Sequence, residues 1–192
     1  VAVALQNLVV KIGENIVIRR LVYLDADSKN TLFGSYVHNK INNNVGKMAC
    51  VVKIFSNDKS NKAVIDLANK IAMHITALKP LALDEKSLDT SFIEKEREIY
   101  TSQLKASGKP GNIIEKIVDG KIKKYLSEVT LINQNWVLEP SLTLDQVLKE
   151  FNSNNNCDLS IIDFKLLILG EGIEVEEKSF SEEVASQVNN TT

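Results

Sequence analysis

The sequence predicts an α+β protein: two-layer antiparallel sheet-plus-helix subdomains with an inserted helical hairpin. Three observations predict it. Several β-branched, partly alternating segments follow one another early in the chain, with only short turn-rich stretches between them, as an antiparallel sheet requires. Segments with apolar residues at helical spacing come next. A final apolar run over 159–169 returns to strand character and is expected to be a strand buried on both faces.

Three strands are expected in the first third of the chain. Residues 1–10 are typical of the end of a helix, so the chain is expected to start in the middle of an element. The expected strands are 14–24, 32–38 and 45–55, and the asparagine-rich stretch 39–44 supplies the turn between the last two. Short connections of this kind favour an antiparallel sheet.

A long amphipathic helix follows the strands. Asp58 or Ser60 can cap its start, and Pro80 cannot continue it. Its apolar stripe consists of Val64, Leu67, Ala68, Ile71, Ile75 and Leu78. The sheet and this helix predict a two-layer core subdomain over 1–80.

A second helix is expected over 91–107. Ser91 and Glu94 fit a capping box at its start. At its end, Gly108 can adopt the left-handed conformation and Pro110 blocks continuation. Residues 81–107, together with 152–172, are predicted to form the C-terminal core subdomain.

The inserted hairpin is expected over 108–151. Its helices are 112–128 and one that begins at Thr143, where Thr143 and Gln146 fit a capping box. An extended segment, 130–140, joins them. After the last strand, 173–192 is predicted to be a helical module, because its apolar residues Phe180, Val184 and Val188 recur every four positions among glutamates.

Composition and charge exclude several classes of protein. The formal net charge of −2 gives no reason to expect nucleic acid or an anionic membrane as a partner, and no apolar run reaches the roughly 18 residues of a membrane helix. Cys50 and Cys157 have neither metal-ligand spacing nor a disulfide framework, and Cys50 is expected to be buried. These features are typical of a cytoplasmic protein.

No catalytic, metal-binding or cofactor-binding motif is present. His38 and His74 lie far apart and form no HExxH pattern, and the glycines form neither GxGxxG nor a phosphate-binding loop. We therefore expect no enzyme activity, no metal and no cofactor. The glutamates of 171–177 lack the spacing of a calcium loop, so a solvated acidic face is the favoured interpretation.

Two features keep a second interpretation open. The lysines of 116–124 could contact the phosphates of RNA, although acidic residues interrupt them and a solvated helix face is favoured. His74 falls at the edge of the apolar stripe, neither fully buried nor fully exposed. A structural histidine is the simpler interpretation, and contact with a partner is the alternative.

Five segments carry a family resemblance. The most specific is SGKPGNIIEKIVDGKIKKY at 107–125. The other four are KIGENIVIRR (11–20), GSYVH (34–38) with the Val-Gly pair that follows, IAMHITALKP (71–80) and LINQNWVLEPSLTLDQVLKE (131–150). In their order, and over nearly the whole chain, they resemble the core and carboxy-terminal part of bacterial translation elongation factor Ts.

The resemblance implies a function that the residue patterns alone do not reach. Members of this family bind elongation factor Tu in its GDP form and accelerate GDP release, by disturbing the magnesium and phosphate contacts around the nucleotide. The implied partner-binding residues are Val45 and Gly46, His74, and Phe180, Glu183 and Val184 of the C-terminal module. All of them match positions or elements that face the GTPase domain of the partner.

One departure from the family concerns activity. The Thr-Asp-Phe-Val motif, which reaches the magnesium site in the family, is absent, as is the N-terminal helical domain. We therefore expect weaker binding of elongation factor Tu than by the intact factor, with little exchange. A dimerisation or scaffold module is the alternative, based on the helical hairpin and the missing motif, with a homodimer as the partner state. A small RNA-binding α+β domain, based on the lysine run alone, is the third.

Overall fold

The computed structural model describes residues 1–26, 28–42, 44–58, 60–108 and 110–173 of the chain. In this part of the chain there are five α-helices, a three-stranded antiparallel sheet and a two-stranded one, which confirms the α+β prediction. None of the helices within the described ranges is long and apolar enough to span a bilayer.

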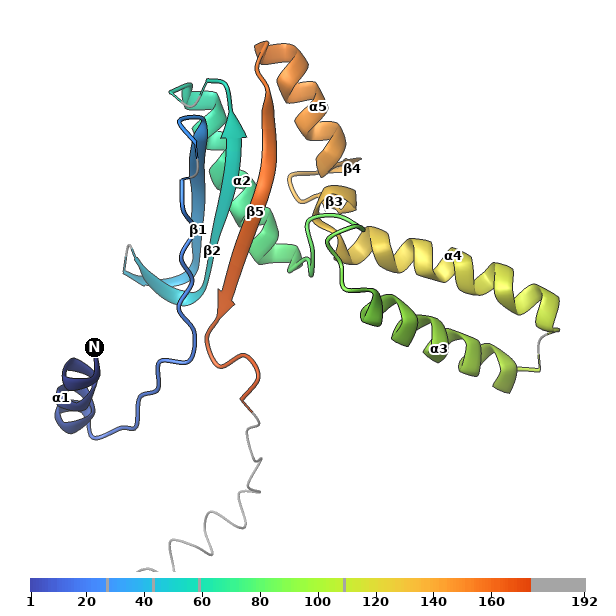
Figure 1. The fold of residues 1–192 in the computed structure, drawn as a ribbon, viewed down its shortest axis with the longest axis horizontal. Coiled ribbons are helices and arrows are strands. Elements are labelled where there is room, and N and C mark those ends of the chain that lie inside the picture. The colour runs from blue at the N-terminus through green and yellow to red at the C-terminus, as the bar shows by residue number, and fades with distance from the viewer. Residues whose placement is uncertain (27, 43, 59, 109, 174–192) are drawn as a thin grey trace, which may run out of the picture.

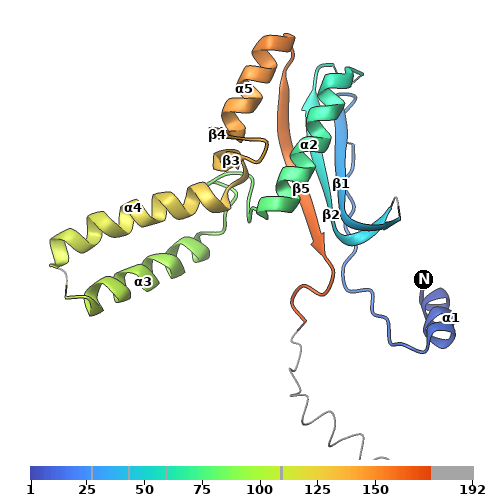
Figure 2. The same ribbon diagram turned by 180° about the vertical axis from the view of Figure 1, so that it is seen from behind.

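The main sheet consists of β1 (Thr31–Asn42), β2 (Val45–Ser56) and β5 (Leu159–Ile168). The strands lie in the order β1-β2-β5 and are antiparallel throughout. Helix α2 (Lys62–Leu78) crosses one face of this sheet, as Figures 1 and 2 show from opposite sides. The second and third strands expected from the sequence are confirmed, as is their packing on a helix in two layers.

The first expected strand, 14–24, is wrong. These residues form an irregular segment that belongs to no strand, and β5 lies beside β2 as the third strand instead. Apolar side chains of the segment are exposed, with Leu21 at 92% and Tyr23 at 82%. A β-branched composition favours an extended backbone but does not supply a partner strand, and the second edge of β2 is occupied by β5.

β5 also differs from its prediction as a strand buried on both faces. It lies at an edge of the sheet, where Leu159 and Ile161 are buried while Ser160 and Ile162 are exposed. α2 covers only one face of the sheet, so the residues on the other face of β5 have no second layer of helices above them (Figure 1).

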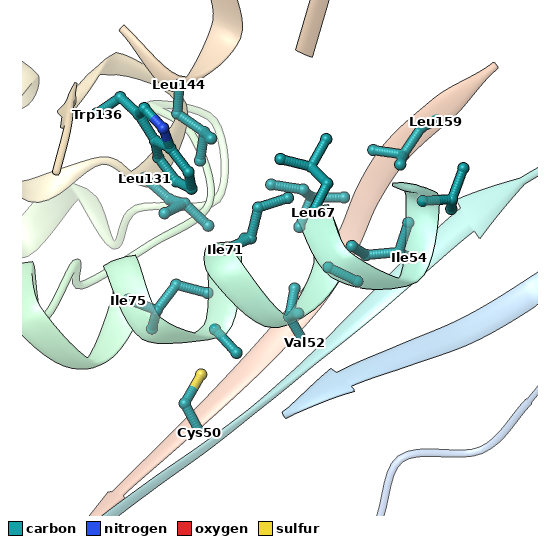
Figure 3. Close-up of a cluster of buried hydrophobic side chains, with 14 residues drawn as sticks. Cys50, Val52, Ile54, Leu67, Ile71, Ile75, Leu131, Trp136, Leu144 and Leu159 are labelled. Atoms are coloured by element: carbon teal, nitrogen blue, oxygen red, sulfur yellow. The ribbon is translucent and has the colours of Figure 1, made fainter. Parts of the chain in front are cut away.

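Helix α2 buries the predicted stripe except at its end. Val64, Leu67, Ala68, Ile71 and Ile75 are buried, whereas Leu78 is 43% exposed. The main core forms where this stripe meets the sheet and the later segments of the chain (Figure 3). Its buried residues include Cys50, Val52, Ile54, Leu131, Trp136, Leu144 and Leu159.

The ends of α2 follow simple capping rules. The N-cap is Asn61, not Asp58 or Ser60, and its side-chain oxygen accepts a hydrogen bond from the Ala63 N–H at 2.9 Å. Lys79 adopts the left-handed conformation at the C-cap, and Pro80 follows. The helix therefore stops where the sequence predicted.

The helical hairpin consists of α3 (Thr90–Ala106) and α4 (Gly111–Val129), and it projects from the core (Figure 1). A separate apolar cluster joins the two helices; its buried members are Leu104, Ile114, Val118 and Ile122. α3 is capped by Asp89 instead of the expected capping box at Ser91. Gly108 is left-handed, as predicted.

The predicted pairing of 112–128 with the helix after Thr143 is therefore wrong. The connection from α4 passes through η1 (Leu131–Asn133), β3 (Asn135–Trp136) and β4 (Glu139–Thr143), which insert into the main core. They leave α5 (Leu144–Asn155) packed against that core beside β5 (Figure 1). The capping box of Thr143 and Gln146 is confirmed.

The remaining segments lie at the ends of the chain. The helix expected at 1–10 is confirmed as α1 (Ala2–Ile12), none of whose residues is buried. The helix expected around Phe180 lies outside the described residues. The division of the chain into subdomains stays a prediction, with the hairpin moved to α3 and α4.

Candidate partner-binding site

His74, a predicted contact residue, is fully buried, with 0% of its surface exposed. The prediction that it sits at the boundary between core and solvent is wrong. The apolar stripe of α2 places it correctly relative to the sheet, but η1 and β3 cover the remaining side of the helix. That cover comes from residues some 60 positions later in the sequence and cannot be inferred from the helix alone.

Every polar atom of the His74 ring has a partner. Its Nδ1 accepts a hydrogen bond from the backbone N–H of Val137 at 3.2 Å, and its Nε2 lies 3.2 Å from Oε1 of Gln134. The ring stacks on Trp136, with 5.0 Å between ring centroids. Because Nδ1 is an acceptor, the proton of the neutral ring is on Nε2, which donates to Gln134.

The environment keeps His74 neutral. Burial lowers the pKa of His74 from 6.5 to about 4, although the hydrogen bond to Gln134 opposes that shift. The Gln134 amide nitrogen donates to the backbone carbonyl of Glu128 at 2.7 Å, which turns the amide oxygen toward the ring. His74 therefore connects α2 to the segment that enters the β3–β4 turn.

A groove of about 570 Å³ lies at the surface in front of this turn. It is lined by residues of β1, β2, the end of α2 and the β3–β4 turn: Tyr36, His38, Met48, Met73, Thr76, Ala77, Lys79, Val137 and Leu138. Both methionines of the chain are among them. Leu138 is 54% exposed and Val137 is 37% exposed, so the turn presents apolar surface beside the groove.

Val45 and Gly46 begin β2, at the end of the β1–β2 hairpin, and Gly46 lines a second groove with residues of 17–20 and 167–171. Val45 is 49% exposed. Gly46 is required by packing, since a Cβ there would lie 2.5 Å from the carbonyl oxygen of His38. The structure therefore places Gly46 and the turn held by His74 at two different grooves, and the partner contact of Val45 and Gly46 stays a prediction.

Phe180, Glu183 and Val184 lie outside the described residues. Two residues of the groove, Met73 and Leu138, are not among the predicted contact residues. Met73 is an apolar residue of α2 outside the buried stripe, and Leu138 is an apolar residue in a tight turn. Met73 could have been found as an apolar residue off the helical stripe, whereas the exposure of Leu138 is a property of the folded turn.

Two of the lysines in 116–124 and one glutamate of 171–177 make intramolecular contacts. Lys121 lies over the ring of Tyr100, 4.8 Å from its centroid, and Lys124 pairs with Glu128 at 3.7 Å. Glu171 pairs with Arg20 at 2.7 Å. Among the described residues there is no group of three or more acidic, histidine or cysteine side chains that could hold a metal ion.

Comparisons with known proteins agree on one family. A family model described as Elongation factor TS matches residues 1–171. Proteins named Elongation factor Ts from Rickettsia felis and Rickettsia typhi are 41% and 42% identical to the chain over 175 residues. These alignments cover 91% of this chain and 56% of each relative. The chain therefore spans about half the length of the curated relatives it matches.

Proposed function

Because the chain belongs to the elongation factor Ts family, we propose that it binds the GTPase elongation factor Tu and promotes the release of its GDP. The exchange is a binding reaction and not a covalent one. If the chain weakens GDP on elongation factor Tu by a given factor, GDP must weaken the chain on elongation factor Tu by the same factor. Translation takes place in the cytoplasm, which is the compartment we propose for this chain.

The groove beside the β3–β4 turn is the observation that carries this proposal. Its walls bring Tyr36, Met48, Met73 and Leu138 together on one surface. Methionine side chains adapt to the shape of a partner, and contiguous exposed apolar surface is typical of protein interfaces. Lys79 at the edge supplies a cation for an acidic residue of the partner.

The other residues expected from the family resemblance belong to the same proposal. Val45 and Gly46 would contact the GTPase domain from the β1–β2 hairpin, where Gly46 lines a second groove. Phe180, Glu183 and Val184 would contact it from the C-terminal module. We propose that residues 1–192 by themselves give only weak exchange, because the Thr-Asp-Phe-Val motif does not occur among them.

Titration of elongation factor Tu bound to GDP tests the groove. We expect Leu138→Ala to weaken binding about tenfold, or about 1.4 kcal/mol, as truncation of a central apolar interface residue does. The matched control is Ile162→Ala, since Ile162 is 43% exposed and lies on β5, on the far side of β2 from β1. Equal affinity of Leu138→Ala and the unaltered chain would remove the groove from the interface.

Release of a fluorescent GDP analogue from elongation factor Tu tests the activity. We expect the chain to bind and to accelerate release only slightly. Release at the rate of a full-length elongation factor Ts would show that the missing motif is dispensable. No binding at all would overturn the proposed function.

Self-association is a second candidate, favoured by the hairpin. Phe92 and Ile99 on α3 and Ile113 on α4 are 46%, 38% and 46% exposed, although the hairpin already has an apolar cluster of its own. A homodimer would bury such residues. Sedimentation velocity over a concentration series tests this, and a single monomeric species at all concentrations would exclude it.

A further inference from the structure

We propose that His74 is a positioning residue: it fixes the β3–β4 turn and thereby one wall of the groove, without touching the partner. The effect on the turn stands on geometry alone. The effect on elongation factor Tu rests on the function proposed above. Different experiments measure the two effects.

The His74 ring restrains three of four consecutive residues. It accepts from the Val137 N–H, donates to the Gln134 side chain and stacks on Trp136. Gln134 is itself held, because its amide nitrogen donates to the carbonyls of Glu128 at 2.7 Å and Leu78 at 3.4 Å. One buried side chain therefore fixes the approach of the chain to the turn.

The pairing of β3 with β4 restrains the turn only weakly. β3 has two residues and β4 has five, and only two residue pairs connect them: Asn135 with Thr143, and Trp136 with Glu139. The register shifts between these pairs. A two-stranded hairpin of this size is not stable by itself. Its position must come from contacts with the rest of the protein. Trp136 packs in the main core and the Leu144 N–H donates to the Gln134 carbonyl at 3.0 Å. His74 adds the hydrogen bond at Val137, the residue that precedes Leu138.

A direct role of His74 in binding does not fit its surroundings. The side chain has no exposed surface, and both ring nitrogens are already hydrogen-bonded within the protein. A partner could reach the ring only after the turn had moved away. The parts of this arrangement that a partner can touch are Val137 and Leu138.

The neutral imidazole is suited to this position because it has one acceptor and one donor. Phenylalanine would keep the volume and the stacking on Trp136 but would lose both hydrogen bonds. Asparagine would lose the stacking but keep an oxygen near the place of Nδ1, where it could accept from the Val137 N–H. These two substitutions therefore separate the hydrogen bond from the packing.

Amide hydrogen exchange by NMR tests the first effect on the 192-residue chain. We expect His74→Phe to speed exchange of the Val137 amide at least tenfold relative to the unaltered chain, with the central amides of β2 still protected. His74→Asn should restore most of the protection of Val137. Unchanged protection of Val137 in His74→Phe would overturn the proposal.

Nitrogen-15 spectra of the unaltered histidine ring give a test that needs no variant. We expect the proton on Nε2 and none on Nδ1. A proton on Nδ1 would exclude the hydrogen bond from Val137 and would overturn the proposal even if His74→Phe did not fold.

Binding of elongation factor Tu tests the second effect. We expect affinity to fall about as far in His74→Phe as in Leu138→Ala, and to recover in His74→Asn together with Val137 protection. Loss of affinity in His74→Asn despite restored protection would indicate direct contact and refute the positioning role. If the unaltered chain does not bind, the proposed function fails, while the exchange and ring measurements still decide whether His74 holds the turn.

Discussion

Gly34 lies where β1 passes under α2, and the closeness of this approach predicts a severe effect of Gly34→Ala. A Cβ at this position would lie 2.2 Å from the carbonyl oxygen of Ala68 and 2.9 Å from its Cβ. The oxygen belongs to the backbone of α2, so it cannot move aside as a flexible side chain would. The helix and the strand would have to separate by about 1 Å to restore normal contact distances.

That separation determines how much unfolding free energy Gly34→Ala costs. A gap of about 0.5–1 Å already removes a quarter to a half of the dispersion energy of each contact, and α2 contributes Leu67, Ile71 and Ile75 to the main core. Inserting a methyl group into a packed core costs about 1–3 kcal/mol. We expect a loss of about 3 kcal/mol for Gly34→Ala, at the upper end of that range because the obstacle is rigid.

Urea unfolding provides the assay, with two probes. Far-UV circular dichroism follows the helices, and fluorescence of Trp136, the single tryptophan, follows the main core. The matched control is Gly120→Ala on the exposed side of α4, where a Cβ would meet nothing within 4 Å. It should stabilise α4 by about 0.5–1 kcal/mol, because alanine is the better helix former. An unchanged unfolding midpoint in Gly34→Ala would refute the close packing of β1 and α2.

Three further predictions follow from titration, thiol chemistry and capping. The pKa of His74 is about 4 in the folded chain, below the ordinary 6.5. Between these two values the unfolded chain binds more protons, so the free energy of unfolding falls by up to about 3 kcal/mol as the pH drops from 6.5 to 4. Urea unfolding of the unaltered chain should show this pH dependence, and His74→Asn should remove it. Burial raises the pKa of Cys50 to about 12. A thiol reagent added to the native chain should therefore label the half-buried Cys157 and reach Cys50 only after unfolding. Rapid labelling of both cysteines would contradict the burial of Cys50 in the main core. Thr143→Ala removes the capping box of α5 and should cost about 1 kcal/mol of unfolding free energy, whereas the exposed Ser153→Ala on the same helix should change it by less than about 0.5 kcal/mol.

The elements that the sequence predicted well are those with a strong local pattern. The stripe of α2 needs only the positions of its own apolar residues, and Pro80 stops the helix through its own backbone. The capping box of Thr143 and Gln146 is likewise contained within four residues. In each case the residues that determine the structure are neighbours in the chain.

The errors concern pairing between distant segments. The composition of 14–24 and of 159–168 is equally typical of a strand, and nothing local decides which of them pairs with the free edge of β2. The pairing of α4 is likewise not decided locally, because its apolar stripe could pack on α3 before it or on α5 after it. Leu104 on α3 and Val118 on α4 meet because the short segment between the helices turns the chain back on itself.

In the candidate site, too, local patterns predict some features and contacts between distant segments decide the others. The pattern of α2 locates His74 on the helix, and the family resemblance marks it as functionally relevant. Its burial depends on Gln134, Trp136 and Val137, and no periodicity in α2 predicts them. Leu138 was missed because its exposure is a property of the folded turn.

The segment 131–138 has two roles that follow from its position. Its inward side chains, Leu131 and Trp136, close the main core, and its outward residue Leu138 lines the groove. It also begins at the base of the hairpin, where the Leu131 N–H donates to the carbonyl of Ala82 at 2.9 Å and ties the two ends of the insertion together. A ligand that displaced this base would displace the groove wall as well. By linkage, occupation of the groove would change the affinity of such a ligand by the same factor as the ligand changes occupation of the groove.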